Sequence, residues 1–192
     1  MRLNPIPPVE FSPEQRALFE QIQDITQGRD RGFTMAREDG AMLGPYNAML
    51  HFPMYGSPVW AVNTALSKHT TLPKAVHEIA ILVTGSRFSA RYEIYAHEFT
   101  AAKAGLSLSQ VSALAAGSRP ATLSEEEGIA FDVAIALSRG AQLPESTYQA
   151  ASTAFGKDGT AELIYLVGFY CMISVLLNGF DVPVPGRDSD GQ

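Results

Sequence analysis

The stretch from 77 to 105 constrains the fold of this 192-residue chain more than any other, because it predicts two helices that meet at a bend. Its first half carries a run of aliphatic residues. Gly85 and Ser86 mark the predicted bend, since Gly lowers helix propensity and Ser competes for backbone hydrogen bonds. The second helix is predicted to begin near Ser89 and to end at Gly105, a residue type suited to the left-handed conformation that follows many helices.

A carboxylate and an imidazole share one face of this second predicted helix. Glu93 and His97 are four residues apart and are therefore neighbours on the helix surface, with Ala90 and Ala101 on the same side. A carboxylate beside an imidazole raises the pKa of the ring and orients it. Glu78 lies nineteen residues before His97, and a reversal between the two helices would bring it across their interface. The three side chains together predict a proton-transfer site.

The remaining chain is predicted to be helical, because no segment alternates apolar and polar residues with a period of two. Ser12, Ser107 and Ser124 are each followed three residues later by Gln or Glu, which predicts a capping box at the start of three helices. A further helix is predicted from Ser57 to about Thr70, with Val62 buried. The fold class is therefore all-α, with about eight helices in a single domain.

The most apolar run, 163–177, is predicted to be a buried central helix, because it is shorter than the roughly 20 residues usually needed to span a membrane. Another predicted break is at Gly156, which ends a helix that runs from Pro144 to Phe155. Residues 28–44 lack a period and contain several glycines, so they are predicted to be a loop that suits a subunit contact or an active-site cover.

The expected organisation is an N-terminal arm, first helix and loop over residues 1–39, the helical domain over 40–185, and a polar tail over 186–192. The net charge is −6 and no long Lys/Arg cluster occurs, which argues against a nucleic-acid partner. The single cysteine, Cys171, excludes an internal disulfide and a CxxC motif. The first residues lack the apolar core of a secretory signal, so a cytoplasmic location is expected, with no membrane partner.

Three further residues are predicted to contact a small-molecule substrate. His51 lies in an apolar context, Tyr92 flanks Glu93, and Arg91 lies near the bend, where it could bind a substrate carboxylate. His77 precedes Glu78 and is predicted to point elsewhere on its helix.

A metal site is a weaker interpretation of the same residues. Two histidines and two carboxylates, His51, His97, Glu78 and Glu93, could hold a non-haem metal. Nothing in their spacing is diagnostic, so neither a metal nor another cofactor is predicted.

The order Glu78, Ala90, Glu93 and His97, with eleven, two and three residues between them, resembles the carboxymuconolactone decarboxylase and AhpD-like superfamily. Flanking segments resemble it as well: GPYNAMLHFP, LPKAVHEIAIL, AAKAGLS and ELIYLVGFYCMISVLLNGF. The resemblance covers roughly residues 40–185. It implies an AhpD-like helical fold and a homo-oligomer, trimeric or hexameric, with sites at subunit interfaces.

The thiol peroxidase branch of that superfamily has cysteines where this sequence has Ala90 and Glu93. The decarboxylase branch resembles this sequence in having a Glu four residues before the His, and it works without a cofactor on a carboxylated lactone. The resemblance therefore implies a cofactor-independent acid–base decarboxylase for a small carboxylated ring compound. In that interpretation His97 delivers the proton, Glu93 orients the His97 ring and restores its proton, and Glu78 holds the other side of the network.

Two other interpretations remain open at this point. The chain could be a non-catalytic or ligand-binding member, in which the Glu–His network only satisfies buried polar groups. It could also be an isomerase or hydrolase that uses the same acid–base pair on another substrate.

The missing cysteines give a first prediction: the protein does not reduce hydroperoxides with a thiol donor. That chemistry needs a nucleophilic thiolate and a resolving cysteine, and Cys171 cannot serve both roles. The measurement is dithiol-dependent hydroperoxide consumption by the wild type and by Cys171→Ser. Turnover that is present in the wild type and lost in the variant would contradict the prediction.

Overall fold

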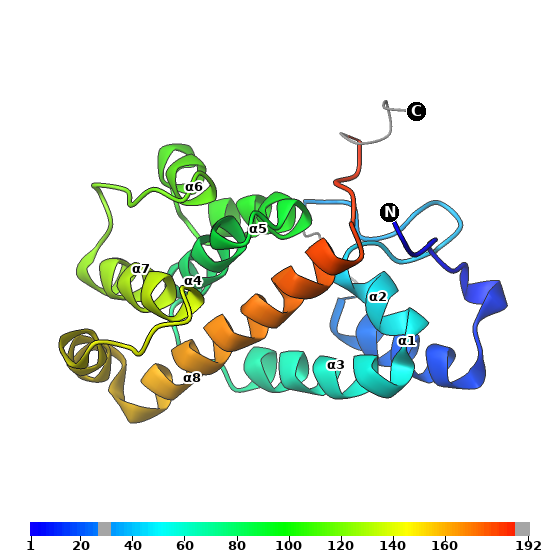
Figure 1. Cartoon of the computed structure of the whole chain (residues 1–192), viewed down its shortest axis with the longest axis horizontal. Helices are drawn as coiled ribbons and strands as arrows, with labels where there is room; N and C mark the ends of the chain where they lie inside the picture. The colour runs from blue at the N-terminus through cyan, green and yellow to red at the C-terminus, as the bar shows by residue number, and fades with distance from the viewer. Residues whose placement is uncertain (27–31, 187–192) are drawn as a thin grey trace.

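The computed structural model describes residues 1–26 and 32–186. The described part contains eight α-helices and one 3₁₀ turn: η1 Pro8–Glu10, α1 Pro13–Thr26, α2 Pro45–His51, α3 Pro53–Lys68, α4 Lys74–Arg87, α5 Arg91–Lys103, α6 Leu108–Ala115, α7 Glu125–Ser138 and α8 Glu145–Gly179 (Figure 1). Over these residues there is no strand, only an isolated bridge between Ala36 and Met42. The predicted all-α, single-domain architecture is confirmed.

The three predicted capping boxes are present. In each, the Ser hydroxyl accepts a hydrogen bond from the backbone N–H three residues later, and the Gln or Glu side chain accepts one from the backbone N–H of the Ser. Gly105 has a φ of 99° just after α5, as the sequence indicates. Part of the predicted loop (28–31) and the tail from 187 onward lie outside the described residues. The proposed boundaries between arm, domain and tail stay a prediction.

Helix α8 separates two apolar cores and contributes to both. Figure 1 shows α8 crossing the molecule with α4–α7 on one side and α1–α3 on the other. The α4–α7 core gathers buried side chains that include Ile81, Leu114, Val133 and Leu163. The α1–α3 core includes Leu18, Leu50, Trp60, Tyr92 and Ile173. Leu66 and Tyr170 pack against both cores and therefore mark the seam between them.

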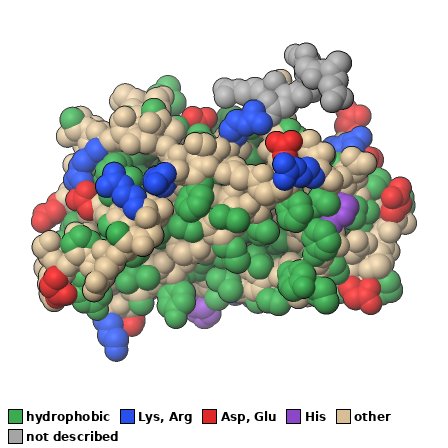
Figure 2. Space-filling view, viewed as in Figure 1, with side chains coloured by type: hydrophobic (Ala, Val, Ile, Leu, Met, Phe, Trp, Pro, Cys, Tyr) green, Lys and Arg blue, Asp and Glu red, His purple; other side chains and the backbone are tan. Residues whose placement is uncertain are grey.

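Among the described helices, α8 alone is long and apolar enough, by length and composition, to cross a membrane. Its buried side chains pack into both cores, and Gly156, with a φ of 68°, interrupts it at the predicted break. We interpret α8 as a core helix for these reasons. Its other side leaves Tyr165 and Val175 exposed, and Figure 2 shows hydrophobic side chains over this face. The homo-oligomer and the cytoplasmic location stay predictions.

The predicted bend at Gly85 and Ser86 is wrong by a few residues. Helix α4 continues through both residues to Arg87, and the chain reverses at Ser89, whose φ is 52°. Gly85 serves the packing of two helices: a Cβ there would lie 3.4 Å from Cγ of Glu93. The glycine thus lets α5 approach α4 closely.

The predicted start of α3 at Ser57 is also wrong. The helix begins at Pro53, whose ring suits the first helical position, and Pro58 lies inside it. Val62, predicted to be buried, is 41% exposed, because the buried side of α3 is the one that carries Trp60.

Gly56 makes the closest approach between α2 and α3, and this gives a stability prediction. A Cβ at Gly56 would collide with the backbone carbonyl of Met49, which cannot move without displacing α2. Gly56→Ala is expected to lower the free energy of unfolding by about 1–3 kcal/mol, the usual cost of overpacking. The measurement is urea unfolding followed by circular dichroism.

Gly168→Ala is the matched control. Gly168 is exposed inside α8 and its added Cβ would meet nothing within 4 Å, so this change is expected to stabilise by about 0.5–1 kcal/mol. Equal effects of the two substitutions would contradict the close contact at Gly56.

Candidate active site

A cavity of about 460 Å³ lies along the seam between the two cores. Helices α2, α3, α4, α5 and α8 all contribute side chains to its wall, and Phe33 adds one from the segment before α2. The wall includes Glu78 from α4, Glu93 and His97 from α5, and Tyr170 from α8. The cavity therefore combines carboxylates, an imidazole and aromatic surface in one space.

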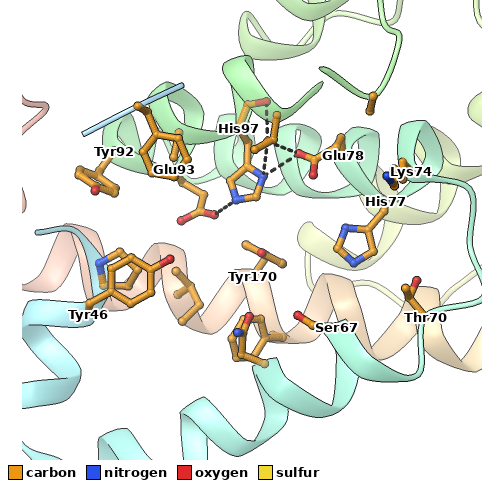
Figure 3. A pocket seen from close by; sticks show the side chains of 18 of the residues that line it. Tyr46, Ser67, Thr70, Lys74, His77, Glu78, Tyr92, Glu93, His97 and Tyr170 are labelled. Atoms are coloured by element: carbon orange, nitrogen blue, oxygen red, sulfur yellow. Dashed lines mark hydrogen bonds and ion pairs between the residues drawn. The ribbon is translucent and has the colours of Figure 1, made fainter. Parts of the chain in front are cut away.

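His97 lies between two carboxylates that come from different helices. Its Nδ1 is 2.7 Å from Oε2 of Glu78, and its Nε2 is 3.0 Å from Oε1 of Glu93 (Figure 3). The hydroxyl of Thr100 donates a hydrogen bond of 2.7 Å to the same Glu78 oxygen. The ring of Tyr170 meets the imidazole edge-on, with 5.3 Å between ring centroids. These contacts fix the imidazole on three sides.

The local sequence explains this geometry. Glu93 and His97 are one helical turn apart on α5, so the helix itself sets their separation. Glu78 reaches the other side of the ring because α5 runs back against α4 after the reversal at Ser89, and Gly85 lets the two helices pack closely. Thr100 follows His97 by three residues and lies on the same face.

The carboxylates set the protonation state of His97. Burial alone would lower its pKa, but the charge of Glu78 and the hydrogen bonds that the ring donates to both carboxylates outweigh burial and raise the pKa to about 10. Burial acts to raise the pKa of Glu78, yet the imidazolium and the Thr100 hydroxyl hold that pKa below its ordinary value. At neutral pH the site therefore holds an imidazolium beside an ionised carboxylate.

The predicted convergence of Glu78, Glu93 and His97 agrees with the structure, while their part in catalysis stays a prediction. Tyr92 also lines the cavity, as expected for a pocket wall. Its hydroxyl donates a hydrogen bond to the carbonyl of Thr34, and burial raises its pKa well above the ordinary value. Tyr92 is therefore a neutral residue of the cavity wall, and its hydrogen bond joins the segment before α2 to α5.

Two predicted substrate contacts lie outside the cavity wall. The Nε2 of His51 lies 2.8 Å from the carbonyl oxygen of Asn4, in the N-terminal arm, because His51 is on the side of α2 opposite Met49, which does line the cavity. Arg91 is exposed at the first position of α5, off the helix face that carries Glu93. The structure gives neither residue a place beside a ligand in this cavity.

The four groups considered as metal ligands do not come together, since His51 is separated from the other three. Within residues 1–26 and 32–186, no group of three or more His, Cys, Asp and Glu side chains is placed to hold a metal ion.

Several wall residues were missed by the sequence reasoning. His77 lines the cavity beside Glu78, so the prediction that it points elsewhere is wrong; neighbours on a helix differ by about 100°, and this cavity is wide enough to receive both. Lys74 and Thr100 are also in the wall. On α3, Trp60, Asn63 and Ser67 recur at intervals of three and four residues, a pattern that could have identified the third wall.

No known family model matches the chain, and no curated protein sequence matches it. Two solved structures match its fold. One is a cysteine-to-alanine variant of the debrominase Bmp8 in complex with 2,3,4-tribromopyrrole, with a TM-score of 0.74, 13% identity, and coverage of 97% of this chain and 92% of that one. The other is Bmp8 in the apo form, with a TM-score of 0.73, 12% identity, and coverage of 96% and 92%. With the eight-helix architecture, these matches confirm the predicted all-α, AhpD-like fold.

The raised pKa of His97 gives a prediction about pH. The ring is expected to stay protonated through pH 8 and to lose its proton only near pH 10, which an NMR titration of the His97 ring nitrogens measures. Glu78→Gln removes the main charge that raises this pKa and should bring the titration back toward the ordinary value, about 6.5. A wild-type ring that loses its proton below pH 8 would contradict the prediction.

The same shift has a consequence for stability. Because folding raises the pKa of His97, the stability from its charge is fully present below about pH 6.5 and is lost as the pH rises toward 10. The difference in free energy of unfolding between wild type and His97→Gln should therefore shrink from pH 6 to pH 10. A constant difference across that range would oppose this assignment.

Proposed function

We propose that this protein is a cofactor-independent acid–base enzyme, a decarboxylase that acts on a small carboxylated ring compound. The observation that carries the proposal is the line of Glu93, His97 and Glu78, buried or largely buried, in the wall of a cavity large enough for such a molecule. The fold shared with a debrominase supports an enzymatic role. The ring compound bound by that debrominase, 2,3,4-tribromopyrrole, supports a substrate of similar size.

In the proposed reaction the bond between the ring carbon and its carboxylate breaks, CO₂ leaves, and the electron pair remains on the ring. A proton must then be added at carbon. His97 holds that proton on Nε2, where Glu93 accepts a hydrogen bond from it, and transfers it to the substrate carbon. Glu78 keeps its contact with Nδ1 throughout and so stabilises the cationic form that is restored from water afterwards.

Thiol chemistry is not proposed for this site. Cys171 is the only cysteine of the chain, it packs against the α4–α7 core, and it is not part of the cavity wall. Burial raises the pKa of its thiol, which disfavours the reactive thiolate. The residues of the cavity wall instead favour proton transfer.

One observation supports a second candidate, a ligand-binding protein without catalysis. Both ring nitrogens of His97 already have carboxylate partners from the chain itself. A network that is satisfied in this way could serve only to compensate buried charge. The two candidates differ in what happens when His97 is removed.

The test is decarboxylation of a carboxymuconolactone-type substrate by wild type and His97→Ala, with folding of both followed by circular dichroism. General acid–base catalysis contributes about 10²–10⁴ in rate, so a folded His97→Ala should lose about that factor. His51→Ala is the matched control, because His51 lies outside the cavity wall, and it should keep wild-type turnover.

Three outcomes would count against catalysis by His97. A wild type without turnover would favour the ligand-binding candidate. A folded His97→Ala with unchanged turnover would remove His97 as the proton donor. An unfolded His97→Ala would favour a structural role, and Glu93→Gln would then report on catalysis with less disturbance of the buried charge.

A further inference from the structure

Each carboxylate beside His97 uses only one of its oxygens to hold the ring. Oε1 of Glu93 lies 3.0 Å from Nε2 of the imidazole, and Oε2 of Glu78 accepts hydrogen bonds from Nδ1 and from the Thr100 hydroxyl. An ionised carboxylate can accept about four hydrogen bonds through its two oxygens. Within residues 1–26 and 32–186, no group donates a hydrogen bond to the second oxygens, Oε2 of Glu93 and Oε1 of Glu78.

The second oxygen of Glu93 borders the open space of the cavity. In the described part of the chain, the side-chain polar atoms that are sealed from solvent and lack a hydrogen-bond partner are Oδ1 of Asn47, Nε1 of Trp60, and the hydroxyls of Ser138 and Ser174. Oε2 of Glu93 is not one of them, although Glu93 is only 3% exposed, so this oxygen meets open space. Because Glu93 lines the cavity, a ligand in the cavity can reach it.

The wall around Glu93 suits a planar ring. Figure 3 shows Glu93 on the side of the imidazole that faces Tyr46 and Tyr92. Trp60 meets the ring of Tyr46 edge-on, with 6.0 Å between ring centroids, and Tyr170 meets the imidazole in the same way. All four aromatic side chains line the cavity. Such a surface buries a planar apolar ligand, and a few well-placed polar groups then fix its orientation.

The charges of the wall favour a neutral hydrogen-bond donor over a cation. Lys74 and Lys103 also line the cavity, and together with the imidazolium of His97 they outnumber the two carboxylates, Glu78 and Glu93. The wall therefore has no excess of negative charge that would attract an ammonium group. The imidazolium, 3.0 Å away, already compensates the charge of Glu93. Oε2 lacks only a hydrogen bond, which a neutral N–H or O–H group can supply.

Glu93 is a better acceptor for such a donor than Glu78. The side chain of Glu93 is 4% exposed and that of Glu78 is 15% exposed, so water reaches the second oxygen of Glu78 more easily. Thr100 also donates to the carboxylate of Glu78 already. A ligand gains more from a hydrogen bond to an acceptor that is poorly hydrated and otherwise unpaired.

We propose that Oε2 of Glu93 accepts a hydrogen bond from a neutral donor, a ring N–H or hydroxyl, on a planar ring that lies in the aromatic part of the cavity. This inference deepens the proposed function, and only its bearing on the reaction rests on that function. A directional hydrogen bond restricts how the ring can turn in its own plane, and so it selects the ring carbon that lies next to Nε2 of His97. The substrate class is then a carboxylated planar ring that also carries an N–H or hydroxyl donor.

The test compares two neutral, planar probes of nearly equal size, indole and benzofuran, of which only indole has a donor. Trp60 is the one tryptophan of the chain and lines the cavity, so its side-chain N–H gives a single NMR signal that follows binding to the ¹⁵N-labelled full chain. Hydrogen bonds to charged groups are the stronger ones, so the wild type should bind indole about tenfold more tightly than benzofuran. Equal affinities, tighter binding of benzofuran, or no binding of indole would overturn the inference.

Glu93→Gln should remove this preference. The amide can keep its oxygen on Nε2 of His97 and turns its NH₂ group toward the cavity, so a donor replaces the acceptor. Indole should then bind no more tightly than benzofuran. A variant that only disturbed the structure would weaken the binding of both probes alike, and circular dichroism verifies folding. A tenfold preference that survives the substitution contradicts the proposed contact.

Glu98→Gln is the matched control, because it is the same chemical change on the same helix at a residue outside the cavity wall. The preference for indole should stay at about tenfold, and its loss in this variant would show that it does not arise at Glu93. If Glu93→Gln does not fold, nuclear Overhauser effects in the wild type locate the donor. The five-membered ring of bound indole should contact the Cγ protons of Glu93, and contact by the six-membered ring instead would refute the assignment.

The inference and the proposed function can fail separately. A preference for the donor that depends on Glu93, in a protein without decarboxylase turnover, would retain the hydrogen-bonding site and refute the enzyme proposal. Turnover that depends on His97, in a protein that binds indole and benzofuran equally, would retain the enzyme and refute the hydrogen-bonding site.

Discussion

The ion pair between His97 and Glu78 is the interaction on which the site depends. A largely buried carboxylate without a partner is costly, and Glu78 remains charged because the imidazolium lies 2.7 Å away and the Thr100 hydroxyl donates a hydrogen bond to it. That distance in turn requires α4 and α5 to pack closely, which Gly85 permits by leaving room for the side chain of Glu93. The charged state of the site thus depends on the close packing of α4 and α5, because a bulkier residue at position 85 would press on the side chain of Glu93.

The features that the sequence predicts correctly are those set by local geometry. The spacing of Glu93 and His97 is fixed within one helix, and the capping boxes at Ser107 and Ser124 involve contacts three residues apart. The predictions that are wrong concern contacts between different helices. Gly85 has the low helix propensity of a helix breaker, but it lies inside α4 and makes room for Glu93 of α5. His77 lies in the wall of a cavity that residues of α3 also line, and no local pattern encodes that arrangement.

The shared fold and the absent family match are informative together. A debrominase has the same helical architecture at 13% identity, so the arrangement of eight helices is compatible with very different sequences. Function is determined by the side chains in the cavity rather than by the fold. Here those side chains include two carboxylates with an imidazole between them, and the sole cysteine packs against the α4–α7 core outside the cavity wall.

The cavity follows the seam between the two apolar cores, where Leu66 and Tyr170 contact both. Regions joined by few shared contacts separate more readily than the interior of either region. A molecule that fills the cavity would touch α3 on one side and α4 and α5 on the other, so its binding free energy would be added to the free energy that opposes their separation. A bound ligand would then stabilise the packing of α1–α3 against α4 and α5. Amides of α1–α3 far from the cavity would gain protection against hydrogen exchange.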